Sequence, residues 1–263
     1  AQQRLAFEEL LANHLAVRQR RERRDALSAQ SIQASTEFWP RLRDALGFTL
    51  TDAQIRSIDE IVADLGKPTP SLRLLQGDVG CGKTVVAAAA VLAAIEGGQQ
   101  AVVMAPTELL AEQHLRVFSG WFEKVGIKPV WLSGRISQRE RRAVCEQLSS
   151  GAARVVVGTH AVFQDDVSYY NLGLVVVDEQ HRFGVAQRLA LREKGQREGS
   201  APHQIIMSAT PIPRSLTMVM YADMDLSVID EMPPGRQPVE TVVLPNTRRE
   251  DVQAVSYTHL RAH

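Results

Sequence analysis

The stretch that most constrains this chain is Gly77-Asp78-Val79-Gly80-Cys81-Gly82-Lys83-Thr84, which matches the pattern G-x-x-x-x-G-K-T. A short apolar run, Leu72 to Leu75, precedes it and predicts a buried strand. An unbroken apolar run, Val85 to Ile95, follows it and predicts a helix. Strand, glycine loop and helix in this order are the context of a phosphate-binding P-loop. The alternative is a glycine turn before an ordinary helix, which the two flanks together disfavour.

Each part of this loop suits a phosphate chain. Its glycines let the backbone N–H groups wrap a phosphate, and the start of the helix adds a partial positive charge. Lys83 is placed to reach the outer phosphates, and the hydroxyl of Thr84 can ligate a magnesium ion. The sequence therefore predicts that residues 77–84 bind a nucleoside triphosphate.

Composition sets broader limits. With 263 residues, 44% of them hydrophobic, the chain can bury the cores of one or two globular domains. No apolar run approaches the roughly 18 residues of a membrane span, so we expect a cytoplasmic protein without a membrane partner. Thirty basic residues balance thirty acidic ones, so a nucleic-acid partner has to be argued from local sites. Cys81 and Cys145 lack the companions that a metal site requires.

The pattern of the chain predicts an α/β fold. Strand-like runs and amphipathic helical runs alternate, which indicates a parallel sheet flanked by helices. The expected strands after the P-loop are 101–104, 128–132, 154–157, 172–177 and 204–207, and the expected helices are 107–124 and 137–148. Before the P-loop, an apolar stripe at helical spacing predicts one helix over residues 1–27, formed by Phe7, Leu10, Leu11 and Leu15.

A possible adenine site precedes the P-loop by about thirty residues. Gln54 stands in the first turn of a predicted helix for which Thr51 is a candidate N-cap. Its amide can accept from the adenine N6 amine and donate to N7, and the ring of Phe48 can pack on the base. Gln54 as an ordinary polar residue in a first turn remains an open alternative.

Two acids end a buried strand. Asp178 and Glu179 follow the apolar run Leu174 to Val177, at the carboxyl end of a strand, where open α/β sheets bind ligands. We expect Asp178 to hold magnesium, directly or through water, and Glu179 to orient the water that attacks the γ-phosphate. A strand that simply ends in polar residues is the alternative. Beside a P-loop, the pair favours nucleotide hydrolysis.

Three further stretches lie at predicted strand ends: Ala105-Pro106-Thr107-Glu108, Gly158-Thr159-His160-Ala161 and Ser208-Ala209-Thr210-Pro211. Each offers hydroxyls and free N–H groups, which suit helix caps and phosphodiester oxygens alike. Singly, each is more often a cap. Together, on the sheet edge that carries the P-loop, they favour translocation along nucleic acid.

These motifs resemble those of the superfamily 2 DNA helicases, and within them the RecG branch-migration helicases. The resemblance extends from about Phe48 to about Pro245 and is carried by GDVGCGKT, MAPTELLAEQH, GTHAVF, VVVDEQHRFGVAQR and MSATPIPRSL. It implies a RecA-like motor domain that uses ATP and Mg²⁺ and acts on branched or duplex DNA, including Holliday junctions and stalled forks, in recombination and repair.

The resemblance also implies residue roles. Gln54 would read adenine, and Lys83, Thr84, Asp178 and Glu179 would handle ATP and magnesium. The implied DNA track holds Thr107, Glu108 and Thr159, and the flanking Gly158 and His160 complete its strand-end segments. Hydrolysis would be coupled to movement by Ser208 and Thr210, and nucleotide state would be relayed by Gln180 and His181.

On this basis we expect three parts. Residues 1–45 would be a helical segment that follows a wedge domain, 46–245 the first motor lobe, and 246–263 the start of a linker with a tail, VSYTHLRAH, that matches nothing in the family. The wedge and the second motor lobe would be this lobe's partners within a monomer. Two alternatives remain: a transcription-repair coupling translocase, against which Gln180 argues, and a nucleotide-gated DNA-binding module that does not hydrolyse.

Overall fold

The computed structural model describes residues 2–33, 38–179, 200–210, 224–235, 245, 246 and 249. The chain divides into two units, residues 1–233 and 234–263, and the elements described here belong to the first. In chain order they are α1 (Gln2–Asp25), α2 (Phe38–Ala45), α3 (Asp52–Leu65), β1 (Leu72–Gly77), α4 (Lys83–Glu96), β2 (Gln100–Met104), α5 (Glu108–Phe122), β3 (Val130–Leu132), α6 (Gln138–Ser149), β4 (Val155–Gly158), β5 (Leu172–Asp178), β6 (His203–Ser208) and β7 (Asp225–Ile229). Two short 3-10 helices, η1 (Glu123–Val125) and η2 (His160–Phe163), follow α5 and β4.

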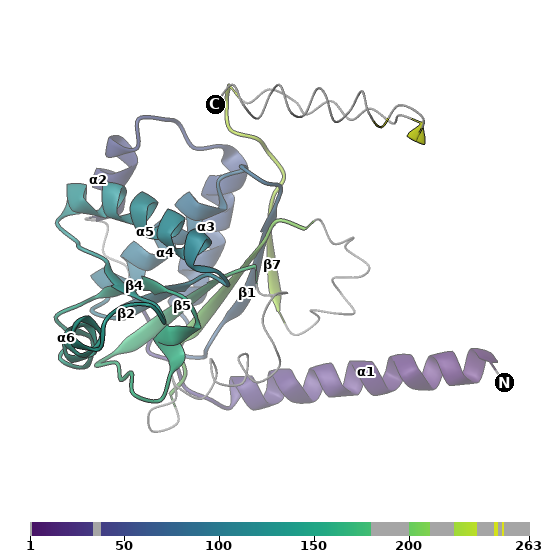
Figure 1. Ribbon diagram of the computed structural model, residues 1–263. Coiled ribbons are helices and arrows are strands. Elements are labelled where there is room, and N and C mark those ends of the chain that lie inside the picture. The colour runs from purple at the N-terminus through teal and green to yellow at the C-terminus, as the bar shows by residue number, and fades with distance from the viewer. Residues whose placement is uncertain are drawn as a thin grey trace. The chain divides into compact units, whose positions relative to one another are not determined.

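The strands form one sheet in the order β3-β4-β2-β5-β6-β1-β7, and every pairing is parallel. Figure 1 shows this sheet with α3, α4 and α5 grouped on one side and α6 apart from them. Strand β5 explains why both faces are covered: Leu174 and Val176 pack into one apolar cluster, and Val175 and Val177 pack into another. The predicted parallel sheet flanked by helices is confirmed.

Helices α3, α4 and α5 bury their apolar residues in the first of these clusters, whereas Leu148 of α6 lies in the second. Every residue of α4 from Val85 to Ile95 is buried, as its unbroken apolar run predicts. Helix α6 begins with a capping box between Ser137 and Glu140, as its sequence indicates.

Two elements escaped the sequence analysis. Helix α2 contains Pro40, which is tolerated because it stands in the first turn of the helix. Strand β7 reads DLSVI and alternates polar with apolar residues at the edge of the sheet, so it lacks the continuous apolar run of the central strands. Between α1 and α2, Ile32 is buried in the main core and its N–H donates to Leu65 O at 2.8 Å. The division of the chain at residues 45 and 245 stays a prediction.

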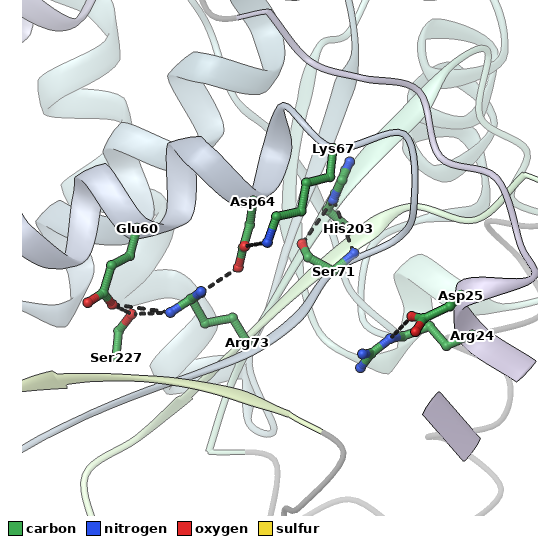
Figure 2. A network of polar contacts seen from close by, with 9 residues as sticks. All are labelled: Arg24, Asp25, Glu60, Asp64, Lys67, Ser71, Arg73, His203 and Ser227. Carbon is green, nitrogen blue, oxygen red and sulfur yellow. Dashed lines mark hydrogen bonds and ion pairs between the residues drawn. The ribbon is translucent and has the colours of Figure 1, made fainter. Parts of the chain in front are cut away.

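An ion-pair network ties the P-loop strand to its neighbours (Figure 2). Arg73 of β1 donates from Nε to Asp64 Oδ2 at 2.6 Å and from Nη1 to Glu60 Oε2 at 3.1 Å, both on α3. Nη1 also donates to Ser227 Oγ of β7 at 2.9 Å. Burial by itself would raise the pKa of Asp64, but the hydrogen bonds from Arg73 and Lys67 outweigh it and hold that pKa below its usual value.

We expect Arg73→Met to lower the free energy of unfolding by about 3 kcal/mol at pH 7, because it leaves the buried Asp64 carboxylate short of its main partner. Chemical denaturation of this chain measures the change. A matched control is Arg56→Met, which breaks an ion pair to Asp230 whose side chains are both about half exposed or more, and should cost less than about 1 kcal/mol.

The same network predicts a pH dependence. Because the pKa of Asp64 is lower in the folded than in the unfolded chain, the contribution of Asp64 to the free energy of unfolding is present above about pH 4, the unfolded value, and is lost as pH falls further.

Adding Asp64→Asn to Arg73→Met should recover stability at pH 7. An equal cost for Arg73→Met with and without Asp64→Asn would contradict this account.

Candidate nucleotide and nucleic-acid site

The sheet order brings the predicted nucleotide residues to one edge. All strands are parallel, so their carboxyl ends share that edge, and β6 lies between β5 and β1. Asp178 of β5 is in register with Met207 of β6, and Ser208 is in register with Gln76 of β1. Two strand spacings, roughly 10 Å, therefore separate the strand that ends in Asp178 from the strand that opens the P-loop. Ser208 lies on the strand between them.

The P-loop runs from the end of β1 to the start of α4, with Gly82 as the N-cap residue. Gly82 has φ +91°, a conformation that favours glycine, and a Cβ there would displace the Gln54 amide that bonds to Cys81 O. The side chain of Cys81 points into the core, and burial raises the pKa of its thiol, which keeps it protonated and unreactive. The exposed residues Asp78, Val79 and Gly80 form the open side of the loop.

Lys83 lies across the loop. Its Nζ donates to Gly77 O at 2.7 Å and to Asp78 O at 3.0 Å. These bonds use two of the three hydrogens of the ammonium group, so it is fixed over the loop and retains a donor for a phosphate oxygen. The contact of Lys83 with phosphates stays a prediction.

Glu179 has an unusual backbone. Its φ of 51° makes it the one non-glycine residue with positive φ in the described part of the chain, a conformation that costs roughly 1–2 kcal/mol for an ordinary side chain. Its N–H donates to Met207 O at 3.0 Å, and its Oε1 accepts from Ala209 N at 3.3 Å. Both bonds tie Glu179 to β6 and the residue after it. Strained residues held in this way cluster at functional sites.

The segment that holds Glu179 is itself ordered by side-chain bonds. Ser208 Oγ and Thr210 Oγ1 are 2.9 Å apart, and Thr210 N donates to Ser208 Oγ at 3.3 Å. Ser208 and Thr210 thus flank Ala209, whose N–H donates to Glu179, and their coupling role stays a prediction.

The residues present are compatible with Mg²⁺. Asp178 offers a carboxylate with 14% of its side chain exposed, and Thr84 is a half-buried hydroxyl residue at the start of α4. Among the described residues, no three His, Cys, Asp or Glu side chains gather as a metal group. Mg²⁺ usually takes only one or two protein oxygens and completes its shell with phosphates and water, so this donor set suits it.

The structure places Gln54 and Phe48, the two residues of the expected adenine site, in separate surroundings. Gln54 is buried: its Oε1 accepts from Thr51 N at 3.0 Å in a capping box, and its Nε2 donates to Cys81 O at 2.8 Å. Phe48 is 47% exposed and lines a cavity of about 490 Å³ with Trp39 and Ile55, and Gln54 is not among the lining residues. The structure does not bring the two residues together around one cavity.

The nucleic-acid candidates lie on the β2 and β4 side of the same edge. Thr107 caps α5, accepting from Leu110 N at 3.4 Å, and is exposed. Glu108 forms an ion pair with Arg135 at 2.9 Å, a contact that the sequence analysis did not anticipate. Gly158 and Thr159 are buried, and Thr159 N donates to Leu132 O at 3.3 Å, so the exposed groups here are Thr107 and His160.

Two predicted residues, Gln180 and His181, lie outside the described part of the chain. One residue to which the sequence analysis gave no role contacts Asp178: Nε2 of His114, the last residue of the string MAPTELLAEQH, is 2.7 Å from Asp178 Oδ2. The two residues are 64 positions apart, so no local sequence pattern indicates this contact.

Comparison with known proteins assigns this arrangement to a family. The DEAD/DEAH box helicase family matches residues 51–219, and the chain belongs to that family. Its sequence is 53% identical to the ATP-dependent DNA helicase RecG of Pasteurella multocida over 97% of this chain and 37% of that protein. It is 53% identical to RecG of Escherichia coli K12 over 96% of this chain and 36% of that protein.

A solved structure of RecG bound to a three-way DNA junction is 40% identical, with a TM-score of 0.86, and covers 97% of this chain and 34% of that chain. The resemblance to RecG and the RecA-like helicase fold are thereby confirmed. The chain spans just over a third of the length of these relatives.

We expect Glu179→Gly to be more stable than Glu179→Ala by about 1 kcal/mol, because only glycine adopts positive φ without strain. Both variants remove the carboxylate, so their difference reports the backbone alone. At the exposed position Glu112 of α5 the order of stability should reverse, with the alanine variant more stable than the glycine variant by about 0.5–1 kcal/mol. Thermal unfolding of the four variants provides the measurement, and the same sign at both positions would contradict the assignment.

Proposed function

We propose that this chain is the first motor lobe of an ATP-dependent DNA helicase or translocase of the RecG type, acting on branched DNA such as Holliday junctions and stalled forks in recombination and repair. The observation that carries the proposal is the meeting, at one sheet edge, of a P-loop with its lysine fixed across it and two acids at the end of β5. Overall likeness to RecG, at 40% identity and a TM-score of 0.86, supports it.

In this proposal the loop 77–84 and the start of α4 hold the phosphates, and Thr84 and Asp178 hold Mg²⁺. Bound there, Mg²⁺ would neutralise developing charge on the β- and γ-phosphates. Glu179 orients the attacking water, and its carboxylate is already directed by Ala209 N. Because Ala209 lies between Ser208 and Thr210, a change at the γ-phosphate reaches that segment through a single hydrogen bond.

The adenine contact remains part of the proposal, with a condition that the geometry imposes. In this conformation Gln54 Oε1 is engaged by Thr51 N, and Nε2 is engaged by the P-loop carbonyl of Cys81. Reading adenine with both amide groups therefore requires Gln54 to exchange those bonds when nucleotide enters. Phe48, half exposed, is free of that requirement as a stacking partner.

The DNA track is likewise proposed, along the ends of β2 and β4. Thr107 and His160 are exposed there, and the loops are joined by Ala105 N donating to Gly158 O at 3.0 Å. Hydroxyl and backbone groups contact phosphates and carry no base sequence, so the proposed binding is indifferent to sequence. A monomeric state, a cytoplasmic location and the roles of Gln180 and His181 stay predictions.

A nucleotide-gated module without hydrolysis is the second candidate from another class. The strained, hydrogen-bonded Glu179 weighs against it, since a purely gating site has no use for a held acid at that position. Within the superfamily, a transcription-repair coupling translocase remains the alternative, and Gln180 in the DEQH string favours the RecG type.

We expect Lys83→Ala to abolish measurable binding of Mg²⁺-ATP by calorimetry, because it removes the cation that the loop holds for the phosphates. Glu179→Gln is the matched control: it keeps Lys83, Thr84 and Asp178, and should bind ATP while losing hydrolysis in an enzyme that carries both motor lobes. Unchanged affinity in Lys83→Ala, or parental turnover in Glu179→Gln, would refute the corresponding assignment.

We expect the 263-residue chain to bind ATP but to hydrolyse it slowly, with or without forked DNA. An arginine finger is worth roughly 10³–10⁵ in rate, and the resemblance places those arginines on a second motor lobe. Arg182 and Arg214, which lie outside the described residues, do not occupy that position in the family motifs. Steady-state ATPase of this chain, compared with the same chain extended by a second lobe, is the measurement. Fork-stimulated turnover equal to that of the extended protein would overturn the mechanism.

A further inference from the structure

The contact between His114 and Asp178 joins a helix to the proposed metal ligand. His114 Nε2 of α5 and Asp178 Oδ2 of β5 are 2.7 Å apart, although the two residues are 64 positions apart in the sequence. Both side chains are largely buried, with 10% and 14% of their surface exposed. A polar contact this short and this sheltered fixes the relative position of the two groups.

The chemistry of the pair decides which atom donates. An ionised carboxylate can only accept, so the hydrogen must be carried by Nε2 of His114. Nε2 carries this hydrogen in the protonated ring and in the neutral ring that donates here. The bond occupies one of roughly four acceptor positions of the carboxylate and leaves the others for a metal ion or its water.

The imidazole ring also packs against an aromatic side chain of its own helix. Its ring meets that of Phe118 edge to face, with centroids 6.2 Å apart at 62°. Phe118 is fully buried and in turn packs edge to face on Phe122 at 5.1 Å. The three residues stand at i, i+4 and i+8 on one face of α5, so the ring that contacts Asp178 is anchored in the core.

We propose that His114 is a positioning residue for magnesium: its Nε2–H orients the Asp178 carboxylate so that the free oxygen positions face the phosphates held by the P-loop. This inference rests on the proposed nucleotide function and goes beyond it, because the motifs there assign no part to His114. Hydrogen bonds to metal-ligating carboxylates from neighbouring groups commonly change metal affinity by roughly 10–100-fold.

The simpler reading is that the pair only attaches α5 to the sheet. The two readings differ in what a substitution changes. Loss of attachment lowers the stability of the chain and leaves the response to Mg²⁺ intact. Loss of positioning alters the response to Mg²⁺ and leaves nucleotide binding without metal intact, because the P-loop contacts do not involve Asp178.

The test uses the 263-residue chain and a fluorescent ATP analogue, with affinity measured in EDTA and across an Mg²⁺ titration. In His114→Leu, which keeps an apolar contact to Phe118 but has no donor, we expect unchanged affinity in EDTA. The Mg²⁺ concentration that gives half of the metal-dependent gain should rise roughly tenfold or more. His114→Gln places an amide N–H near the position of Nε2 and should stay close to the parental value.

His114→Asn, whose donor lies one bond too far back, should behave as His114→Leu does, and it replaces that variant if leucine prevents folding. Unfolding midpoints check that each variant is folded. Parental Mg²⁺ dependence in the donor-free variants, or equal loss in Gln and Leu, overturns the role of His114.

Lys83→Ala distinguishes the two proposals. If Mg²⁺ does not raise the nucleotide affinity of the parent, and Lys83→Ala binds nucleotide as the parent does, both the nucleotide function and the role of His114 are refuted. If Mg²⁺ raises the affinity of the parent and Lys83→Ala does not bind nucleotide, the nucleotide function is supported whatever the result for His114.

Discussion

A parallel sheet buried on both faces leaves one place for chemistry. Strand β5 packs Leu174 and Val176 into one cluster and Val175 and Val177 into another, so no side chain of its centre reaches solvent. Polar groups can appear only where such strands end. Because every pairing is parallel, those ends share one edge, and the strand order decides which of them are neighbours. Placing β6 between β5 and β1 is what sets Ser208 between the acids and the phosphate loop.

The helices that cover the sheet also hold that edge in place. Arg73 links the P-loop strand to α3 through Asp64 and to β7 through Ser227, so β1 is braced on two sides. The start of α3 receives two further ties: Gln54 Nε2 donates to Cys81 O in the P-loop, and Glu231, just after β7, accepts from Ala53 N at 3.2 Å. A carboxylate at that position also complements the positive end of the helix. Residues distant in sequence therefore brace the loop on which phosphate binding depends.

The sequence predicted the elements whose burial is continuous and missed those that depend on partners. The P-loop follows from its glycine and lysine spacing, and α4 and the central strands follow from unbroken apolar runs, so neither needs knowledge of the fold. Strand β7 exists only because β1 offers it an edge, so its alternating DLSVI was not recognised. The sequence Thr51-x-x-Gln54 is a capping-box pattern. It therefore indicates the local role of Gln54 that the structure shows, in addition to the adenine interpretation. The contact of His114 with Asp178 joins residues 64 positions apart, and no local pattern encodes it.

Helix α5 connects the proposed DNA track to the proposed magnesium ligand. Thr107, the exposed N-cap of α5, belongs to the proposed DNA track. His114 lies seven residues after Thr107, about 10 Å along the helix axis. The same helix is locked to the core by the buried rings of Phe118 and Phe122. In the proposed function, a DNA phosphate bound at the Thr107 cap would therefore contact the same helix that carries His114, without an intervening loop. Coupling between DNA and metal through α5 would require a difference in free energy between two positions of this helix.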